Sequence, residues 1–170
     1  LRGSVCTALF RKEILHDLRF PKGILHEDEE FTPQLMLRAE NLYFTNNKAY
    51  YYRKREGSIM HKRDKRWHIR RLADAEQVLY RLKERVDYLP VKERIAMERR
   101  IAQLTMDHIY NVITMTHDET HLDHVLQRLS RHGLFPLPDK DYTSKYKWFR
   151  KMTNSSFGRK TLIMLLRLKG

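Results

Sequence analysis

The chain is poor in cysteine and has no long apolar run. Its single cysteine, Cys6, excludes an internal disulfide, and there is no Cys-x-x-Cys pair to hold zinc. This cysteine usage fits a reducing compartment best. No stretch approaches the roughly 18 consecutive apolar residues of a membrane-spanning helix, and the start has no signal-peptide pattern. We therefore expect a cytoplasmic protein.

Glycine and proline are also scarce, with 6 and 5 residues among 170, and no internal repeat is evident. The content of 41% hydrophobic and 32% charged residues is that of a folded globular chain, so extensive disorder is excluded. The length suits one domain, or one domain with a helical extension. Because the sequence begins with Leu1 rather than Met, we expect a piece of a longer protein.

Positive charge is abundant but unevenly distributed. The formal net charge is +13, and residues 61–170 carry 24 Lys and Arg against 13 Asp and Glu. Residues 1–60 carry 10 against 8 and are almost balanced. The second part of the chain should therefore attract polyanions, either nucleic acid or an anionic membrane face.

The pattern of apolar residues divides the chain into an α/β part, residues 1–62, and a helical part, residues 63–170. In the first part, Val5–Phe10 has the composition of a buried strand. The aromatic runs 42–45 and 49–53, separated by Asn46-Asn47, predict a hairpin. Thr32-Pro33 has the form of an N-cap followed by proline at the first helical position.

The helical part shows apolar stripes at intervals of three and four residues. Two further features mark helix ends, Gly133 as a C-cap and 153–156 as a capping cluster. Thr116 with Glu119 has the form of a capping box, and a metal site at His117 and His121 is the weaker interpretation. The stripes contain Leu72, Ala75, Leu79, Leu82 and Val86, then Ile101, Thr105, His108, Val112 and Met115, then Leu122, Val125 and Leu129.

Four consecutive carboxylates, Glu27–Glu30, lie within the stretch ILHEDEEF. Acidic residues at a helix start favour the helix dipole, which is the ordinary explanation for such a run. Helical spacing, however, puts Asp28 on the side of Leu35, so that Asp28 should point inward. Glu29 and Glu30 fall on the opposite side and are expected to be solvated.

An ordered set of motifs between Val5 and Met60 resembles the C-terminal half of the catalytic domain of inverting family 2 glycosyltransferases of the GT-A type. The resemblance covers about a third of the chain and implies a partial GT-A domain in front of a basic helical region. Its motifs are Leu9–Leu15, Phe20–Gly23, Glu27-Asp28 with Phe31, Tyr50–Arg53 and Arg55–Ile59.

The resemblance implies sugar transfer in the synthesis of bacterial surface polysaccharides. The donor would be a nucleotide-sugar and the acceptor a saccharide or a lipid-linked saccharide. Asp28 would be the general base that removes the proton of the acceptor hydroxyl, a task that suits a fixed carboxylate. Glu27 would help to orient the acceptor or the base.

The resemblance also implies a donor-binding loop. Arg53, Arg55 and Ser58 would contact the diphosphate, and His61 would be a candidate metal ligand; a solvated basic loop is the alternative. A divalent cation, Mg or Mn, would be held mainly by an N-terminal half with an Asp-x-Asp motif. The only such string here, Asp139–Asp141, predicts a helix start instead. The chain should therefore be inactive alone.

Residues 142–170 alternate basic and aromatic side chains and end in an apolar helix with basic flanks. This pattern fits a helix lying on the anionic inner face of the cell membrane, and a packed helix with a solvated basic face is the alternative. A competing class is a basic helical nucleic-acid-binding or adaptor module without catalysis. No nucleic acid is expected, because no DNA-binding motif occurs and the acidic run would repel phosphates. A third possibility is a non-catalytic scaffold.

Overall fold

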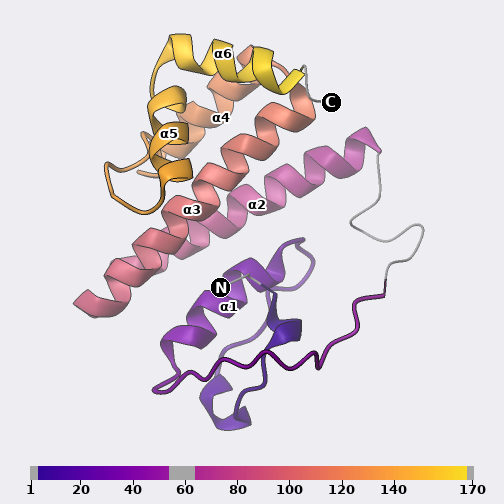
Figure 1. The fold of residues 1–170 in the computed structure, drawn as a ribbon, viewed down its shortest axis with the longest axis vertical. Helices are drawn as coiled ribbons and strands as arrows, with labels where there is room; N and C mark the ends of the chain where they lie inside the picture. The colour runs from indigo at the N-terminus through magenta and orange to yellow at the C-terminus, as the bar shows by residue number, and fades with distance from the viewer. Residues whose placement is uncertain (1–3, 54–63, 168–170) are drawn as a thin grey trace. The chain divides into compact units, whose positions relative to one another are not determined.

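A computed structural model describes residues 4–53 and 64–167 of the chain. Over these residues the chain forms helices and irregular segments, and no strand occurs in the described part (Figure 1). Two compact units divide it, residues 1–78 and 79–170. None of the described helices is long and apolar enough to cross a membrane.

The first unit contains two short 3-10 helices, η1 (Val5–Thr7) and η2 (Lys12–Leu15), and the helix α1 (Glu27–Leu37). Its small core consists of Leu18, Phe31 and Leu35, with Val5, Ile14 and Leu15 packed against them. Arg38 follows α1 and joins it to η2, because its guanidinium donates to the Leu15 carbonyl at 2.6 Å and to Asp17 at 2.8 Å. The helix α2 (Lys65–Val86) begins in this unit and ends in the second.

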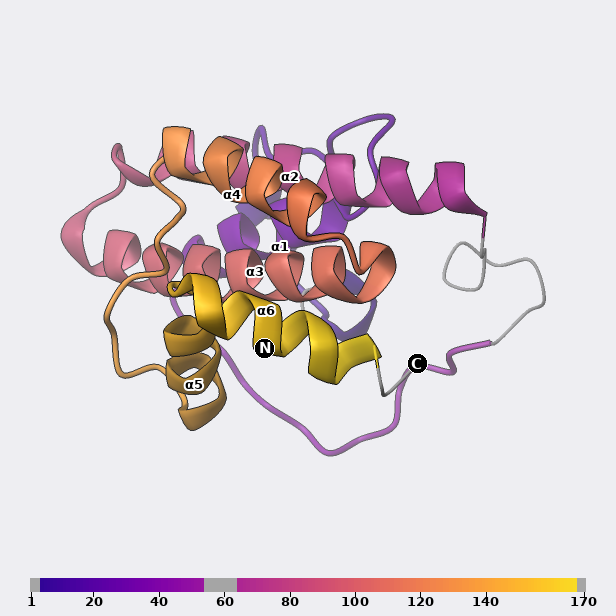
Figure 2. The same ribbon diagram turned by 90° about the horizontal axis from the view of Figure 1, so that it is seen from above.

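The second unit is built around α3 (Val91–Thr116), which packs against the three helices that follow it. These are α4 (Glu119–Arg131), α5 (Ser144–Thr153) and α6 (Ser156–Arg167). Seen from above, α4 and α6 run alongside α3 (Figure 2). The stripes predicted from the sequence form the core, since Leu82, Val112 and Leu122 are fully buried. The predicted helical character of residues 63–170 is therefore correct over the described part.

Helix ends in the second unit follow local chemistry. Gly133 has φ +65°, and the amides of Gly133 and Leu134 donate to the carbonyls of Ser130 and Leu129, which is a Schellman motif. The predicted C-cap is thus confirmed. The predicted capping box is wrong, because Asp118 caps α4 by accepting from the His121 amide at 3.1 Å. Thr116 instead belongs to the last turn of α3.

The predicted α/β character of residues 1–62 is wrong, because the described part of this segment contains no strand. Val5–Thr7 is a 3-10 helix, and residues 41–53 have neither helical nor strand structure. β-propensity becomes a strand only where a neighbouring strand completes the hydrogen bonds, and no strand is available among the described residues. The chain is therefore all-α over the residues described.

Candidate functional site

The four carboxylates form the first turn of α1. Glu27 is its first residue, and His26 precedes it with φ +64°. The predicted N-cap at Thr32 is wrong: the N-cap of α1 is His26, six residues earlier, and Pro33 lies inside the helix. Residues preceding proline disfavour helical backbone, but that preference is outweighed here by carboxylates at the positive end of the helix dipole and by burial of Phe31 and Thr32.

Three contacts from the first part of α2 hold the loop before α1. The Leu25 amide donates to Asp74 Oδ2 at 2.9 Å, and the Arg70 guanidinium donates to the Gly23 carbonyl at 2.9 Å. Arg71 Nε lies 3.3 Å from His26 Nε2. The contacts of these α2 residues with the loop were not predicted from the sequence. The only sequence feature that could have drawn attention to them is the i,i+4 ion pair of Arg70 and Asp74, which lie 3.6 Å apart.

Burial differs among the four carboxylates. Glu27 is exposed, Asp28 and Glu29 are half-buried, and Glu30 is only 3% exposed. The expectation that Glu30 is solvated is therefore wrong, because α1 turns a broader face inward than the narrow stripe through Leu35 indicated. Asp28 is thus partly accessible to solvent.

An apolar hollow of about 640 Å³ lies in the first unit beside α1. Phe20 and Phe31 stack in its wall with ring centroids 3.9 Å apart. Phe31 comes three residues after Asp28, on the same side of α1. The hollow is lined by Phe10, Lys12, Glu13, Leu15, His16, Leu18, Arg19, Phe20 and Phe31.

The predicted donor-binding residues lie mostly beyond the described structure. Arg53 is exposed at the end of an irregular segment, while Arg55, Ser58 and His61 fall outside the described residues. Where the structure is described, no group of three or more His, Cys, Asp and Glu side chains could hold a metal ion. His117 and His121 do not share a helix face, because His117 follows the end of α3 and His121 lies in α4.

A second candidate site is the outer surface of α5 and α6, which we call the α5–α6 surface. α5 buries Tyr146, Phe149 and Thr153 at helical spacing and turns Trp148 outward. α6 buries Leu162 and Ile163 and exposes apolar side chains on its other side. The surface consists of Lys145, Lys147, Trp148 and Lys151 from α5 and Phe157, Lys160, Met164, Leu165 and Arg167 from α6.

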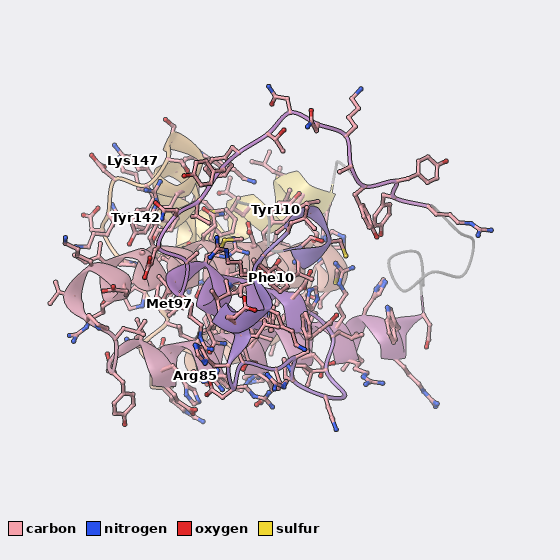
Figure 3. The ribbon with its side chains drawn as sticks, turned by 90° about the horizontal axis from the view of Figure 1, so that it is seen from below. Phe10, Arg85, Met97, Tyr110, Tyr142 and Lys147 are labelled. Carbon is pink, nitrogen blue, oxygen red and sulfur yellow. The ribbon has the colours of Figure 1, made fainter. Side chains whose placement is uncertain are left out.

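Part of the positive charge near this surface is paired. Lys147 Nζ lies 2.6 Å from Asp141, and Arg150 lies 2.6 Å from Asp139, so the Asp-x-Asp string contacts α5 from the preceding loop. It does not start the helix, which begins at Ser144. Tyr142 and Lys147 lie close together at one edge of the second unit (Figure 3). The exposed pair of Lys147 and Asp141 is weak and leaves the lysine available to a stronger anion, whereas the Arg150 side chain is only 18% exposed.

A shallow hollow of about 420 Å³ borders the α5–α6 surface, between the start of α4 and α6. Lys160 and Arg167 line it together with Glu119, Ile163 and Met164. Lys160 Nζ is 3.7 Å from Glu119, and the Arg167 guanidinium donates to the His117 carbonyl. The hollow thus combines two cations with an apolar wall.

Comparison with known protein families, curated proteins and solved structures finds no match to this chain. Together with the absence of strands from the described residues, this overturns the resemblance to a GT-A glycosyltransferase. A GT-A domain requires a sheet, and those of the motifs that fall among the described residues lie in irregular segments and in helices. The resemblance rested on short motifs, and short motifs also occur in proteins with other folds.

Proposed function

We propose that the chain is a basic helical module that docks on an anionic membrane surface through the α5–α6 surface. The observation that carries the proposal is the mixture of outward apolar and cationic side chains on two consecutive helices. Trp148 is 52% exposed, Phe157 80% and Met164 64%, and three exposed lysines lie within three residues of Trp148 on α5. Interfacial helices combine these two kinds of residue in the same way.

Both kinds of side chain contribute to such docking. Each Lys or Arg near an anionic leaflet contributes about 1 kcal/mol, and each buried methylene about 0.8 kcal/mol. Trp148 suits the headgroup level, because its ring is apolar and its N–H can still find a polar partner. Basic residues that are paired in water, such as Lys147 and Lys160, can exchange a carboxylate for a lipid phosphate.

Nucleic acid is the other polyanion that a chain of net charge +13 attracts. The α5–α6 surface favours lipid, because Met164 and Leu165 are exposed beside the cations and a phosphate backbone offers no apolar partner to them. Contacts to nucleic acid are instead made by charged and hydrogen-bonding groups, with aromatic rings for unpaired bases.

Sedimentation with phosphatidylcholine vesicles, with and without phosphatidylserine, tests the proposal. We expect binding only to the anionic vesicles and release by high salt. Phe157→Ser combined with Met164→Ser should weaken this binding about tenfold or more, because the loss of two inserted side chains exceeds 1.4 kcal/mol. Ile95→Ser is the control, since Ile95 on α3 is 62% exposed, close to the 64% of Met164.

The same variants separate lipid binding from the alternatives. Equal binding of the double variant and the unchanged chain to anionic vesicles would contradict the proposal. So would salt-sensitive binding to duplex or single-stranded DNA that is tighter than binding to vesicles. In a Trp67→Phe background, the fluorescence of Trp148 should shift to the blue on vesicle binding, which reports insertion directly.

Sugar transfer with Asp28 as the base stays a prediction. One observation favours chemistry at this position: Asp28 is half-buried and lies one turn before Phe31, which lines an aromatic hollow. Turnover of a nucleotide-sugar donor by the intact protein, compared with Asp28→Asn, tests it. Loss of general-base catalysis lowers turnover by roughly 10²–10⁴-fold.

A further inference from the structure

Residues 40–53, which we call the aromatic segment, are exposed along their whole length. The segment carries six large apolar side chains between 48% and 92% exposed. So many neighbouring apolar side chains in water mark an interaction surface. They are Leu42, Tyr43, Phe44, Tyr50, Tyr51 and Tyr52.

The backbone of the aromatic segment also lacks partners in a helix or sheet. It has no helical or strand structure, and the hydrogen bonds that the structure shows within it are local. The Asn47 amide donates to Thr45 Oγ1 at 3.2 Å, and the Ala49 amide donates to the Asn47 carbonyl at 3.1 Å. Five of its fourteen residues are nevertheless aromatic, a residue type enriched in strands. The segment can therefore become a strand only if another segment pairs with its backbone.

The sequence of the aromatic segment is complementary to itself in the antiparallel direction. When Asn46 of one copy faces Asn47 of another, Tyr43 faces Tyr50 and Glu40 faces Arg53. Because such a dimer is two-fold symmetric, each of these pairs occurs twice in it. Aromatic pairs and opposite charges directly across an antiparallel ladder each contribute about 0.2–1 kcal/mol. In this register, opposite charges face each other and aromatic side chains face each other.

A hairpin within one chain would make the same pairs around Asn46-Asn47, but the structure shows no ladder between its two arms. A two-stranded hairpin alone is marginal in water. Pairing between two copies extends the ladder across the whole segment and uses both arms at once. The apolar surface available is on the order of 800 Å² per copy, taking 150–250 Å² for each aromatic side chain. A two-stranded ladder packs these side chains against each other only in part, so the buried area is smaller than this and belongs to the small, weak class of interfaces.

We propose that two copies of this chain associate through the aromatic segment, which pairs with itself as an antiparallel, two-fold symmetric β-ladder. Main-chain hydrogen bonds supply affinity, as in other cases of strand addition. Facing tyrosines and the two Glu40–Arg53 pairs set the register.

Sedimentation velocity over micromolar to submillimolar concentrations tests the proposal, with the infrared amide I band recorded at each concentration. We expect a monomer–dimer equilibrium in which β signal rises together with the dimer. Tyr43→Lys should raise the dimer dissociation constant roughly 2- to 30-fold, because it removes both aromatic pairs with Tyr50, each of which contributes about 0.2–1 kcal/mol. Tyr88→Lys is the matched control, since Tyr88 is also exposed but lies outside the segment.

A charge exchange tests the register itself. Glu40→Arg and Arg53→Glu should each weaken the dimer several-fold, because like charges then face each other twice, and the two changes combined should restore it. A monomer at all concentrations, a β signal independent of concentration, or a dimer unaffected by Tyr43→Lys would overturn the proposal. Failure of the combined exchange to restore the dimer would overturn the register.

Discussion

Single side chains hold the loop before α5 in place. Tyr146 is fully buried, and its hydroxyl donates to the Pro138 carbonyl at 2.9 Å. The ring of Tyr142 lies 5.0 Å from that of Tyr146, centroid to centroid, and the Arg99 guanidinium lies 5.5 Å from the centre of the Tyr142 ring. A buried phenol with one hydrogen-bond partner is stable only while it keeps its proton.

Burial, the largest cause, raises the pKa of Tyr146 from 10.0 to about 12. Because the folded-state pKa lies above the unfolded value, the contribution of Tyr146 to stability is complete below about pH 10. That contribution is then lost as the pH rises toward about 12. Alkaline conditions should therefore lower the stability of the second unit, because Tyr146 loses its proton.

Tyr146→Phe should lower the free energy of unfolding by about 1 kcal/mol at neutral pH, because it removes the hydrogen bond to Pro138. The deficit should shrink between about pH 10 and about pH 12, since the variant has no phenol to deprotonate there. Urea titrations at several pH values measure it, with the exposed Tyr88→Phe as the control. A deficit that stays constant with pH would contradict the assignment.

At the scale of the element, the junction of α5 and α6 depends on one glycine. Gly158 is buried in the first turn of α6, where its amide donates to Ser155 Oγ at 2.9 Å. A Cβ at this position would meet the Met152 carbonyl oxygen, and it would lie 2.7 Å from Met152 Cα. These atoms are backbone, so the clash cannot be relieved by rotating a side chain. The two helices cross closely because residue 158 has no side chain.

Gly158→Ala should therefore destabilise the second unit by about 3 kcal/mol or more, at the upper end of the range for overpacked sites. Gly133→Ala makes the matched comparison. Its Cβ would meet only Lys83 Cε at 3.7 Å, and the left-handed backbone at φ +65° costs roughly 1–2 kcal/mol. Urea denaturation of both variants measures the difference. A smaller loss at Gly158 than at Gly133 would contradict this account of the crossing.

The elements also show what could be predicted from the sequence. The stripe from Leu72 to Val86 predicted α2, because helical periodicity is a local property that a long amphipathic helix carries within itself. The aromatic segment predicted strands, but a strand needs a partner that the local sequence does not specify. Similarly, Pro33 suggested a helix start, whereas the real start at Glu27 follows a loop that Arg70 and Asp74 contact from 47 and 49 residues further along the chain.

For the candidate sites, residue types were easier to predict than surroundings. The sequence identified the carboxylates of α1 and the basic, aromatic character of residues 142–170. Burial of Glu30 and the hollow beside Phe31 could not be predicted, because both depend on how η2 and α1 pack. The outward position of Trp148 follows from which face of α5 packs on α3.

At the scale of the whole molecule, the two compact units differ in the size of their cores. In the first unit, α1 contributes Phe31 and Leu35 to a small cluster of buried apolar residues that Leu18 completes. In the second, α3 alone buries a run of side chains between Met97 and Ile113 and contacts three other helices. Hydrophobic stabilisation scales with apolar area removed from water, so the two units should differ in local stability.

Native-state hydrogen exchange of the intact chain measures this difference. Amides of α3 around Ile109 and Val112, which are fully buried, should exchange only through global unfolding and should be the slowest. Amides of α1 should exchange through a local opening of lower free energy, with weak dependence on added denaturant, because little surface is exposed when a small core opens. Protection of α1 equal to that of α3, with the same denaturant dependence, would mean that the two units unfold as one.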